Sequence, residues 1–336
     1  MTAFADIVRR TVRGATAQDA VRPLLRAEDA AALIDQVRGA RAARIARPVG
    51  QRSPGDSASA WLGRGLDYAE SRAYQAGDDL RDLHWRLLAR TGRPYVKVHR
   101  EEHAPAWHAL LDLRPAMAFG TRLRTKAEQA ARMALLACAT QALAAEGAPG
   151  SMGITLWQHS PRAIDLGRGL PAVRRLTQVL GQEQVIPVSS SDLAFEPSAD
   201  ATALFANWAQ RLARTLSDGS RLVLISDGAD WDAPEIDSAL WALRGCAEVV
   251  LLLVSDPVEH ALPSGVALDA ATFVDLARRQ NGTLPGAAVL RAEFTRLAQQ
   301  RRDALLARWR SRGLRCVDAG VEQGDAAVLR ALRSRA

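Results

Sequence analysis

The sequence predicts an α/β fold in which a doubly wound, mostly parallel sheet is covered by helices on both faces. Short, continuously apolar runs such as "WHALLDL" and "RLVLISDG" have the pattern of buried parallel strands. Longer segments with helical spacing alternate with these runs over most of the chain after residue 105. The 336 residues are 48% hydrophobic, which suffices for a large core. Alternation of this kind is typical of doubly wound sheets.

The first part of the chain lacks this alternation of strand and helix patterns. Helical spacing of apolar residues predicts an amphipathic helix or helix pair over 17–46, and the Gly-, Pro- and Ser-rich stretch that follows reads as a linker. We therefore expect three parts: an N-terminal helical region with a linker over 1–60, a segment of distinct composition over 61–104, and the α/β domain over 105–336.

Within the α/β domain the elements are predicted in order. Strands are expected at 107–113, at "GITLW" and "RAIDL", at 221–228, at 247–256 and at "LRCVDAG". Helices are expected at 125–146, 171–181, 201–216, 234–244, 289–312 and in "GDAAVLRALRS". The run "TFVDLARRQNGTLPG" predicts a hairpin with Asn281-Gly282 as its turn.

Charge and cysteine content exclude several classes of protein. The formal net charge is +7, and the arginines mostly alternate with acids on predicted helices, which indicates solvated faces; no basic patch with interleaved aromatics predicts nucleic-acid binding. Three cysteines without a CxxC pair indicate neither a zinc site nor a disulfide framework. No apolar run approaches the length of a membrane span or a signal peptide, so a cytoplasmic location is expected.

Residues 63–97, "GRGLDYAESRAYQAGDDLRDLHWRLLARTGRPYVK", carry the most specific pattern in the chain. The segment resembles the signature of the bacterial DUF58 family. The matching and interaction candidates among them are Arg72, Tyr74, Asp78, Asp79, Trp85, Arg86 and Arg90. In this family the segment leads into a von Willebrand factor A-like domain, so the resemblance implies that fold for the rest of the chain.

Much of this segment also has a structural explanation. Asp78 or Asp79 is expected to cap a helix that Gly92 ends, and Asp82 is spaced to pair with Arg86. Arg72 and Tyr74 lie outside that helix. We interpret these two residues, together with one aspartate of the Asp78-Asp79 pair, as a joint to the α/β domain, and a partner-facing role is the alternative.

The resemblance also implies a place for a metal site. Von Willebrand A domains usually bind a divalent cation through Asp-x-Ser-x-Ser after the first strand, a later Thr and an Asp after the fourth strand. Here the first motif reads Asp112, Arg114 and Ala116, so both hydroxyls are missing, while Asp227 and, in a looser alignment, Thr202 take the later positions. Such a set is poor for Mg²⁺, which prefers octahedral oxygen ligands, and the site is expected to be degenerate. If Arg114 folds toward Asp112 or Asp227, it replaces the cation; if it points outward, it meets an acidic partner or repels a metal.

No catalytic motif is present, and "HREEHAPAWH" reads as a polar strand end because its first two histidines would lie far apart in a strand. The family resemblance implies a non-enzymatic adaptor that acts with a MoxR-type AAA+ ATPase on client proteins, without a cofactor. Asp227, Asp230 and Asp232 are the expected contact region beside Arg114. The alternatives are a divalent-cation-dependent binding domain of the von Willebrand A type and, third, an enzyme or nucleic-acid binder.

Overall fold

The structure, a computed structural model, describes most of the chain in two compact units. One unit comprises residues 1–46 and 105–336, and the other comprises 47–104. The described residues are 22–45, 67–75, 79, 81, 83–100, 105–121, 123–144, 150–185, 201–217, 219–228, 231, 233–261, 272–275, 280–283, 288–322 and 325–333. Each unit is described by itself below.

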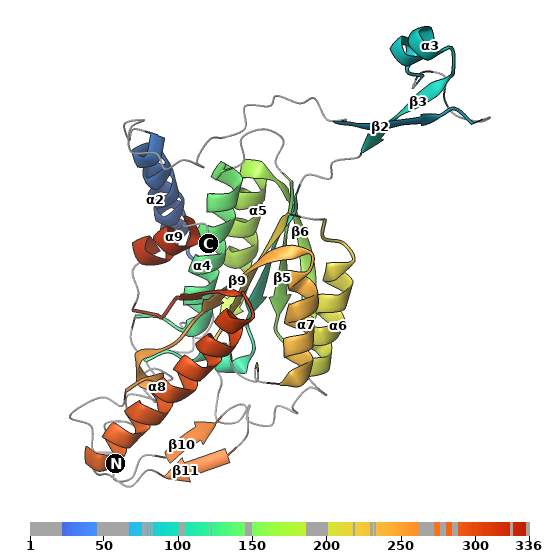
Figure 1. The fold of residues 1–336 in the computed structure, drawn as a ribbon. Helices are drawn as coiled ribbons and strands as arrows, with labels where there is room; N and C mark the ends of the chain where they lie inside the picture. Colours follow the sequence, from blue (N-terminus) through green and yellow to red (C-terminus); the bar gives the residue numbers. More distant parts are fainter. Residues whose placement is uncertain are drawn as a thin grey trace. The chain divides into compact units, whose positions relative to one another are not determined.

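The larger unit is built on one six-stranded sheet (Figure 1). Its strands are β4 (Trp107–Asp112), β5 (Ser151–Trp157), β6 (Pro161–Arg168), β8 (Ser220–Ser226), β9 (Ala247–Leu253) and β12 (Arg315–Asp318). They lie in the order β12-β9-β8-β4-β5-β6. All neighbours are parallel except β5 and β6, which form an antiparallel edge. This order confirms the predicted doubly wound, von Willebrand A-like fold, because the chain first builds outward on one side of β4 and then on the other.

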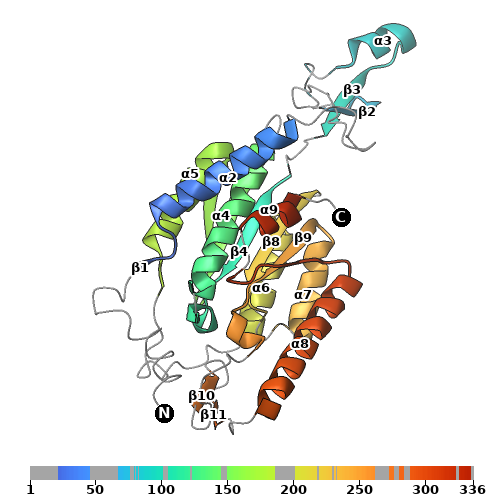
Figure 2. The ribbon, with the colours of Figure 1, turned by 90° about the vertical axis from the view of Figure 1, so that its left-hand side faces the viewer.

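Helices cover both faces of this sheet, as the sequence predicts (Figures 1 and 2). One face carries α2 (Ala27–Ile45), α4 (Lys126–Ala144), α5 (Gly169–Gln182) and α9 (Asp325–Arg333), and the other carries α6 (Ala201–Ala213), α7 (Pro234–Arg244) and α8 (Ala288–Ser311). Two separate apolar clusters result, because alternate residues of each strand point to opposite faces. Leu111 of β4 belongs to the first cluster and Leu110 to the second.

The N-terminal helix is part of this unit. Leu33 of α2 is fully buried in the cluster that α4 and α5 also form, and Asp29 pairs with Arg132 of α4 at 3.0 Å. A short strand before it, β1 (Arg22–Pro23), pairs with β7 (Gln184–Val185). The expected helix at 17–46 is therefore found over 27–45, while residues 1–21 and the expected boundary at residue 60 lie outside the described residues.

The predicted hairpin exists, but its turn is not where the sequence places it. The strands β10 (Thr272–Asp275) and β11 (Gln280–Thr283) pair with Asn281 opposite Val274 and Gly282 opposite Phe273. Asn281 and Gly282 thus lie inside β11, and the chain reverses between Asp275 and Gln280. The prediction of an Asn-Gly turn is wrong here. The pairing of β10 with β11 sets the register, and in this register both residues lie opposite β10 within a strand.

The smaller unit is a two-stranded antiparallel sheet with one short helix. The strand β2 (Asp67–Ala73) pairs with β3 (Tyr95–Arg100), and α3 (Trp85–Thr91) lies between them in sequence. Leu83 and Val96 are buried and form an isolated bridge between the two segments.

The predicted start of this helix is wrong. The helix begins at Trp85, and His84 caps it by accepting a hydrogen bond from the Leu87 amide at Nδ1 (3.1 Å). Asp79 instead accepts from the Arg81 amide in a local turn, while Asp78 and Asp82 lie outside the described residues. Leu83 pairs with Val96 in a bridge, and the helix begins only after it. Gly92 ends the helix in the left-handed region at φ 68°, as predicted.

Candidate functional site

In this strand order, the switch point of the sheet lies between β4 and β8. The first and fourth strands, β4 and β8, are neighbours at the centre, and the chain leaves them toward opposite sides. Ligands of doubly wound sheets bind outside the carboxyl ends of such strands. Asp112 is the last residue of β4, and Asp227 directly follows β8. We call this region, with the residues that contact these two acids, the carboxyl edge.

Arg114 folds back onto Asp112. Its Nε lies 3.0 and 3.2 Å from the two carboxylate oxygens, and its Nη2 lies 2.8 Å from Oδ2. The Arg114 amide also donates to Oδ1 at 3.0 Å. The Asp112 side chain is fully buried and that of Arg114 is 13% exposed. A buried carboxylate is tolerated only when a charge and several hydrogen bonds compensate its lost hydration, and Arg114 supplies both.

Two further side chains complete this ion pair. The Ser226 hydroxyl donates to Asp112 Oδ2 at 2.7 Å, and it accepts from the Gly228 amide at 3.1 Å. The Arg114 guanidinium lies over the ring of Trp157, 4.3 Å from its centroid. Trp157 ends β5 and is itself buried. The arginine is therefore held by a charge on one side and an aromatic face on the other.

A second cation, Lys126, forms an ion pair with the neighbouring acid, Asp227. The ammonium of Lys126, at the start of α4, lies 2.7 Å from Asp227 Oδ2 and 2.6 Å from Glu259 Oε1. The Lys126 and Asp227 side chains are 3% and 7% exposed, whereas Glu259 is 37% exposed. Burial lowers the pKa of Lys126, but the two carboxylates outweigh it, so the pKa is raised above its usual value. The lysine stays charged throughout the neutral range.

Asp256, the other acid at a buried strand end, has a structural role. Its carboxylate accepts from the Thr121 amide at 2.8 Å and caps the short 3₁₀ helix η5 (Pro257–Glu259) through the Val258 amide at 3.0 Å. Glu259 returns the contact by accepting from the Asp256 amide at 2.9 Å. This capping box fixes the loop that carries Glu259 to Lys126.

The described residues fit a divalent cation poorly. Both oxygens of Asp112 already accept from the Arg114 guanidinium, and Asp227 is bound to the Lys126 ammonium. Mg²⁺ would need these oxygens free, together with hydroxyl groups that Arg114 and Ala116 replace. No group of His, Cys, Asp and Glu in the described part of the chain has the arrangement of a metal site.

The order of strands and helices places the remaining positions of the metal motif, Ala116 and Thr202, near the carboxyl edge. Ala116 is in the 3₁₀ helix η3 (Pro115–Ala118), directly after Arg114, and is half-buried. Thr202 is in the first turn of α6, the helix that leads into β8, and is also half-buried. Asp230 and Asp232 lie outside the described residues.

The signature residues lie in the smaller unit. Arg72 is exposed on β2, with Nη1 3.3 Å from the Ala73 carbonyl, and the Tyr74 amide donates to the Pro94 carbonyl at 3.0 Å. On α3, the side chains of Trp85, Arg86 and Arg90 are exposed. The role predicted for Arg72 and Tyr74, as a joint to the larger unit, remains a prediction.

Sequence reasoning missed Lys126, Ser226 and Glu259. Lys126 carries a usable signal: it is one of two lysines in an arginine-rich chain, with Lys97. It also stands at the first position of a helix, where the helix dipole disfavours a cation. A charge in that unfavourable place indicates a compensating acid nearby. Glu259 is 133 residues away in sequence, and no local pattern connects the two.

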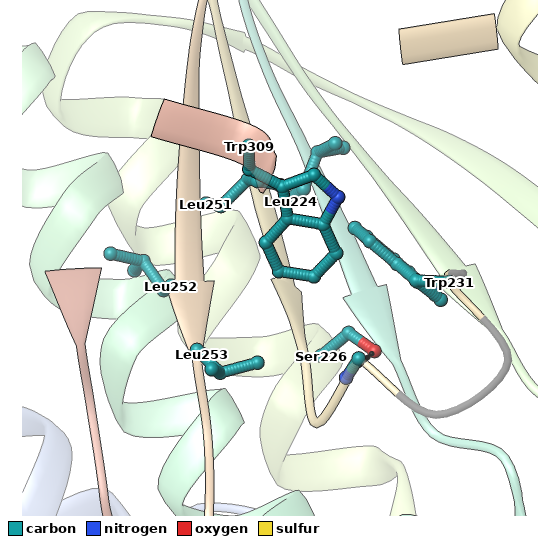
Figure 3. Close-up of a pocket in the computed structure, with 8 residues that line it drawn as sticks. Leu224, Ser226, Trp231, Leu251, Leu252, Leu253 and Trp309 are labelled. Atoms are coloured by element: carbon teal, nitrogen blue, oxygen red, sulfur yellow. Dashed lines mark hydrogen bonds between the residues drawn. The ribbon is translucent and has the colours of Figure 1, made fainter. Parts of the chain in front are cut away.

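A small cavity of about 10 Å³ lies between β8, β9 and α8 (Figure 3). Ser226, Trp231 and Trp309 are among its lining residues. The indole N–H groups of Trp231 and Trp309 are buried and lack a hydrogen-bond partner among the described residues. The cavity holds at most about one water molecule, so it is no ligand pocket.

His108 is a half-buried residue of β4. Its Nε2 lies 2.9 Å from the Thr155 hydroxyl, which also accepts from the Trp208 indole at 3.0 Å. The hydroxyl proton is therefore free to donate to a neutral imidazole. Burial lowers the pKa of His108 to about 4. This histidine has a structural explanation, and the side chains of His99 and His103 in "HREEHAPAWH" lie outside the described residues.

The model of a protein family described as "Protein of unknown function DUF58" matches residues 70–304. No curated protein matches the chain. In the described part of the chain, no helix combines the length and the apolar character needed to cross a bilayer.

Solved structures are similar at low identity. An aerotolerance-related membrane protein from Bacteroides fragilis is 13% identical, with a TM-score of 0.39, over 68% of this chain and 96% of that chain. A conserved hypothetical protein BatB from Bacteroides thetaiotaomicron is 12% identical, with a TM-score of 0.38 and the same coverage. A von Willebrand factor type A structure from Catenulispora acidiphila is 12% identical, with a TM-score of 0.30, over 47% of this chain and 34% of that chain.

Proposed function

Because the chain belongs to the DUF58 family, we propose that it is a non-enzymatic interaction module, an adaptor through which a MoxR-type AAA+ ATPase acts on client proteins. The carboxyl edge is the proposed contact surface. The observation that carries this proposal is the pairing of Asp112 with Arg114 and of Asp227 with Lys126. Both acids have resident cations, so the edge keeps one fixed charge pattern without recruiting a metal.

This arrangement suits recognition rather than chemistry. Each charged group is held by at least one opposite charge at 2.6 to 2.8 Å, which keeps the charges of the edge in fixed positions. A rigid set of paired charges lowers the ordering cost of binding, because the side chains are already in place. Glu259, with 37% of its side chain exposed, is the member of the set that a partner can reach.

The test is co-purification of the two proteins. A MoxR-type ATPase is expected to be retained by the wild-type chain and to show a changed rate of ATP hydrolysis when the chain is added. Glu259→Arg should weaken retention, because it places a cation against Lys126 at the reachable point of the edge. Arg174→Glu, at an exposed position within α5, is the control for a change of charge.

If the ATPase is retained equally by the wild type and by Glu259→Arg, the carboxyl edge is not the contact surface. If no MoxR-type ATPase is retained or altered in rate, the adaptor proposal itself fails. The cation-dependent binding domain is the competing function, and it requires that retention depend on added Mg²⁺.

A further inference from the structure

An exposed tryptophan lies at the opposite end of the sheet from the carboxyl edge. Trp241, near the end of α7, is 60% exposed. The helices α7 and α8 both end where the strands β9 and β12 begin, so their last turns share the amino end of the sheet (Figure 2). A large exposed aromatic has no stabilising role of its own in a folded chain, and tryptophan is enriched where proteins bind each other.

One arginine lies near the ring of this tryptophan, and two more pair with an acid of the same helix. The Arg244 guanidinium lies 5.5 Å from the ring centroid of Trp241. Arg308 and Arg312, from the end of α8, both pair with Asp237 of α7, Arg312 at 2.9 Å. The favourable effect of cations at helix carboxyl ends explains why arginine is found there. It does not explain why an exposed indole lies among them.

Arg244 lies against a backbone turn and is accessible to a ligand. Gly313 has φ 73°, which favours glycine, and a Cβ at this position would lie 2.6 Å from Nη2 of Arg244. Arg244 is exposed, so its N–H groups can donate to an acidic ligand.

A shallow hollow lies between these groups, lined by Asp237, Leu240, Trp241, Arg244, Arg312 and Leu314. The Oδ2 atom of Asp237 takes both of its arginine contacts, whereas Oδ1 is buried without a hydrogen-bond partner among the described residues. The described side chains of the hollow thus combine more cations than acids with an apolar floor. A ligand that fits brings carboxylates for the arginines.

We propose that this hollow, with Trp241 at its rim, is a second interaction surface that docks an acidic segment of a partner protein. The carboxylates of the segment pair with Arg244 and Arg312, and an apolar side chain covers Trp241. A nucleic acid would also meet the arginines. It is disfavoured because it needs a row of aromatic faces, and on this face the described residues offer one exposed aromatic, Trp241.

The experiment is a fluorescence-anisotropy titration of the purified chain against labelled probes. The probes are a short peptide of Asp and Glu interspersed with Leu, the same peptide with Asn and Gln, and a single-stranded oligonucleotide of equal charge. Trp241→Ala and Arg244→Gln are each compared with Arg174→Gln on α5, which removes an exposed arginine from the other face. Thermal melts of every variant verify that it is folded.

The acidic peptide is expected to bind the wild type and Arg174→Gln equally. Trp241→Ala and Arg244→Gln should each weaken this binding by about tenfold or more, as central Trp and Arg contacts do. The amide peptide should bind at least about tenfold less tightly than the acidic one, because charged hydrogen bonds to arginine are lost. The proposal is overturned if the acidic peptide does not bind, if both Trp241→Ala and Arg244→Gln behave like Arg174→Gln, or if the oligonucleotide binds this face more tightly.

Discussion

Replacing Lys126 with methionine tests the ion triad of Lys126, Asp227 and Glu259. The methionine keeps the apolar stem and removes the ammonium, so the buried Asp227 loses the cation that lies 2.7 Å from it. Removal of one partner from a buried ion pair costs about 3–5 kcal/mol, because the other charge remains desolvated. Glu259 contributes little to this loss, since 37% of its side chain is exposed and water can replace the lysine.

The assay is urea unfolding at neutral pH with linear extrapolation to water. The free energy of unfolding of Lys126→Met is expected to fall by about 3–5 kcal/mol. The double variant Lys126→Met, Asp227→Asn should recover a large part of that loss, because no unpaired buried charge remains. Arg38→Met is the matched control, as it removes an exposed cation and should change stability by less than about 0.5 kcal/mol.

Two results would refute the reasoning. In the first, Lys126→Met stays within about 1 kcal/mol of the wild type, which would mean that Asp227 is hydrated or neutral. In the second, the double variant is no more stable than Lys126→Met, which would place the cost in lost packing rather than in the unpaired carboxylate.

Three further predictions concern the same unit. Arg114→Leu should lower the free energy of unfolding by about 3–5 kcal/mol, because it leaves the fully buried Asp112 without a cation; stability close to wild type would contradict the pairing. Between pH 7 and pH 4 the protein should lose about 3 kcal/mol through His108, because its pKa of about 4 lies below the unfolded value and the unfolded state binds the proton first. His108→Gln should flatten that part of a urea-unfolding pH series, and an unchanged slope would refute it. Gly228→Ala should cost about 1–2 kcal/mol in the same assay, since φ is 74° and the new Cβ would lie 3.1 Å from side chains of β9 and α8; a neutral effect would show that the turn can relax.

The sequence was sufficient for the architecture of the larger unit. Its strands are short apolar runs and its helices carry apolar stripes, so each element is specified by its own residues. The helix predicted at 234–244 is found as α7 (Pro234–Arg244), and that predicted at 289–312 is α8 (Ala288–Ser311). The parallel order of the sheet follows from the alternation of the two kinds of element.

Local sequence signals gave wrong predictions where contacts with distant segments determine the local structure. Asp79 is a good helix cap by type, but Leu83 is paired with Val96 in a bridge, and His84, directly after it, is the cap. Asn281-Gly282 is a good turn by type, but it is paired within a strand. In both cases a preference of about 1 kcal/mol is outweighed by pairing with a distant segment.

The candidate site was predictable in part for the same reason. Asp112 and Asp227 were found because each ends a buried strand, and strand ends meet at one edge. The sequence left the direction of Arg114 open, and the structure shows it on Asp112. Lys126 and Glu259 needed the fold, because the contacts of the lysine span 101 and 133 residues of sequence.

The central claim, that resident cations take the place of a metal at the carboxyl edge, is tested most directly by calorimetric titration of the purified chain with Mg²⁺ and Mn²⁺. The account predicts no binding heat with either ion, for the wild type and for Asp112→Ala alike. Binding in the micromolar range that Asp112→Ala abolishes would contradict it, because the carboxylate would then serve a metal rather than Arg114.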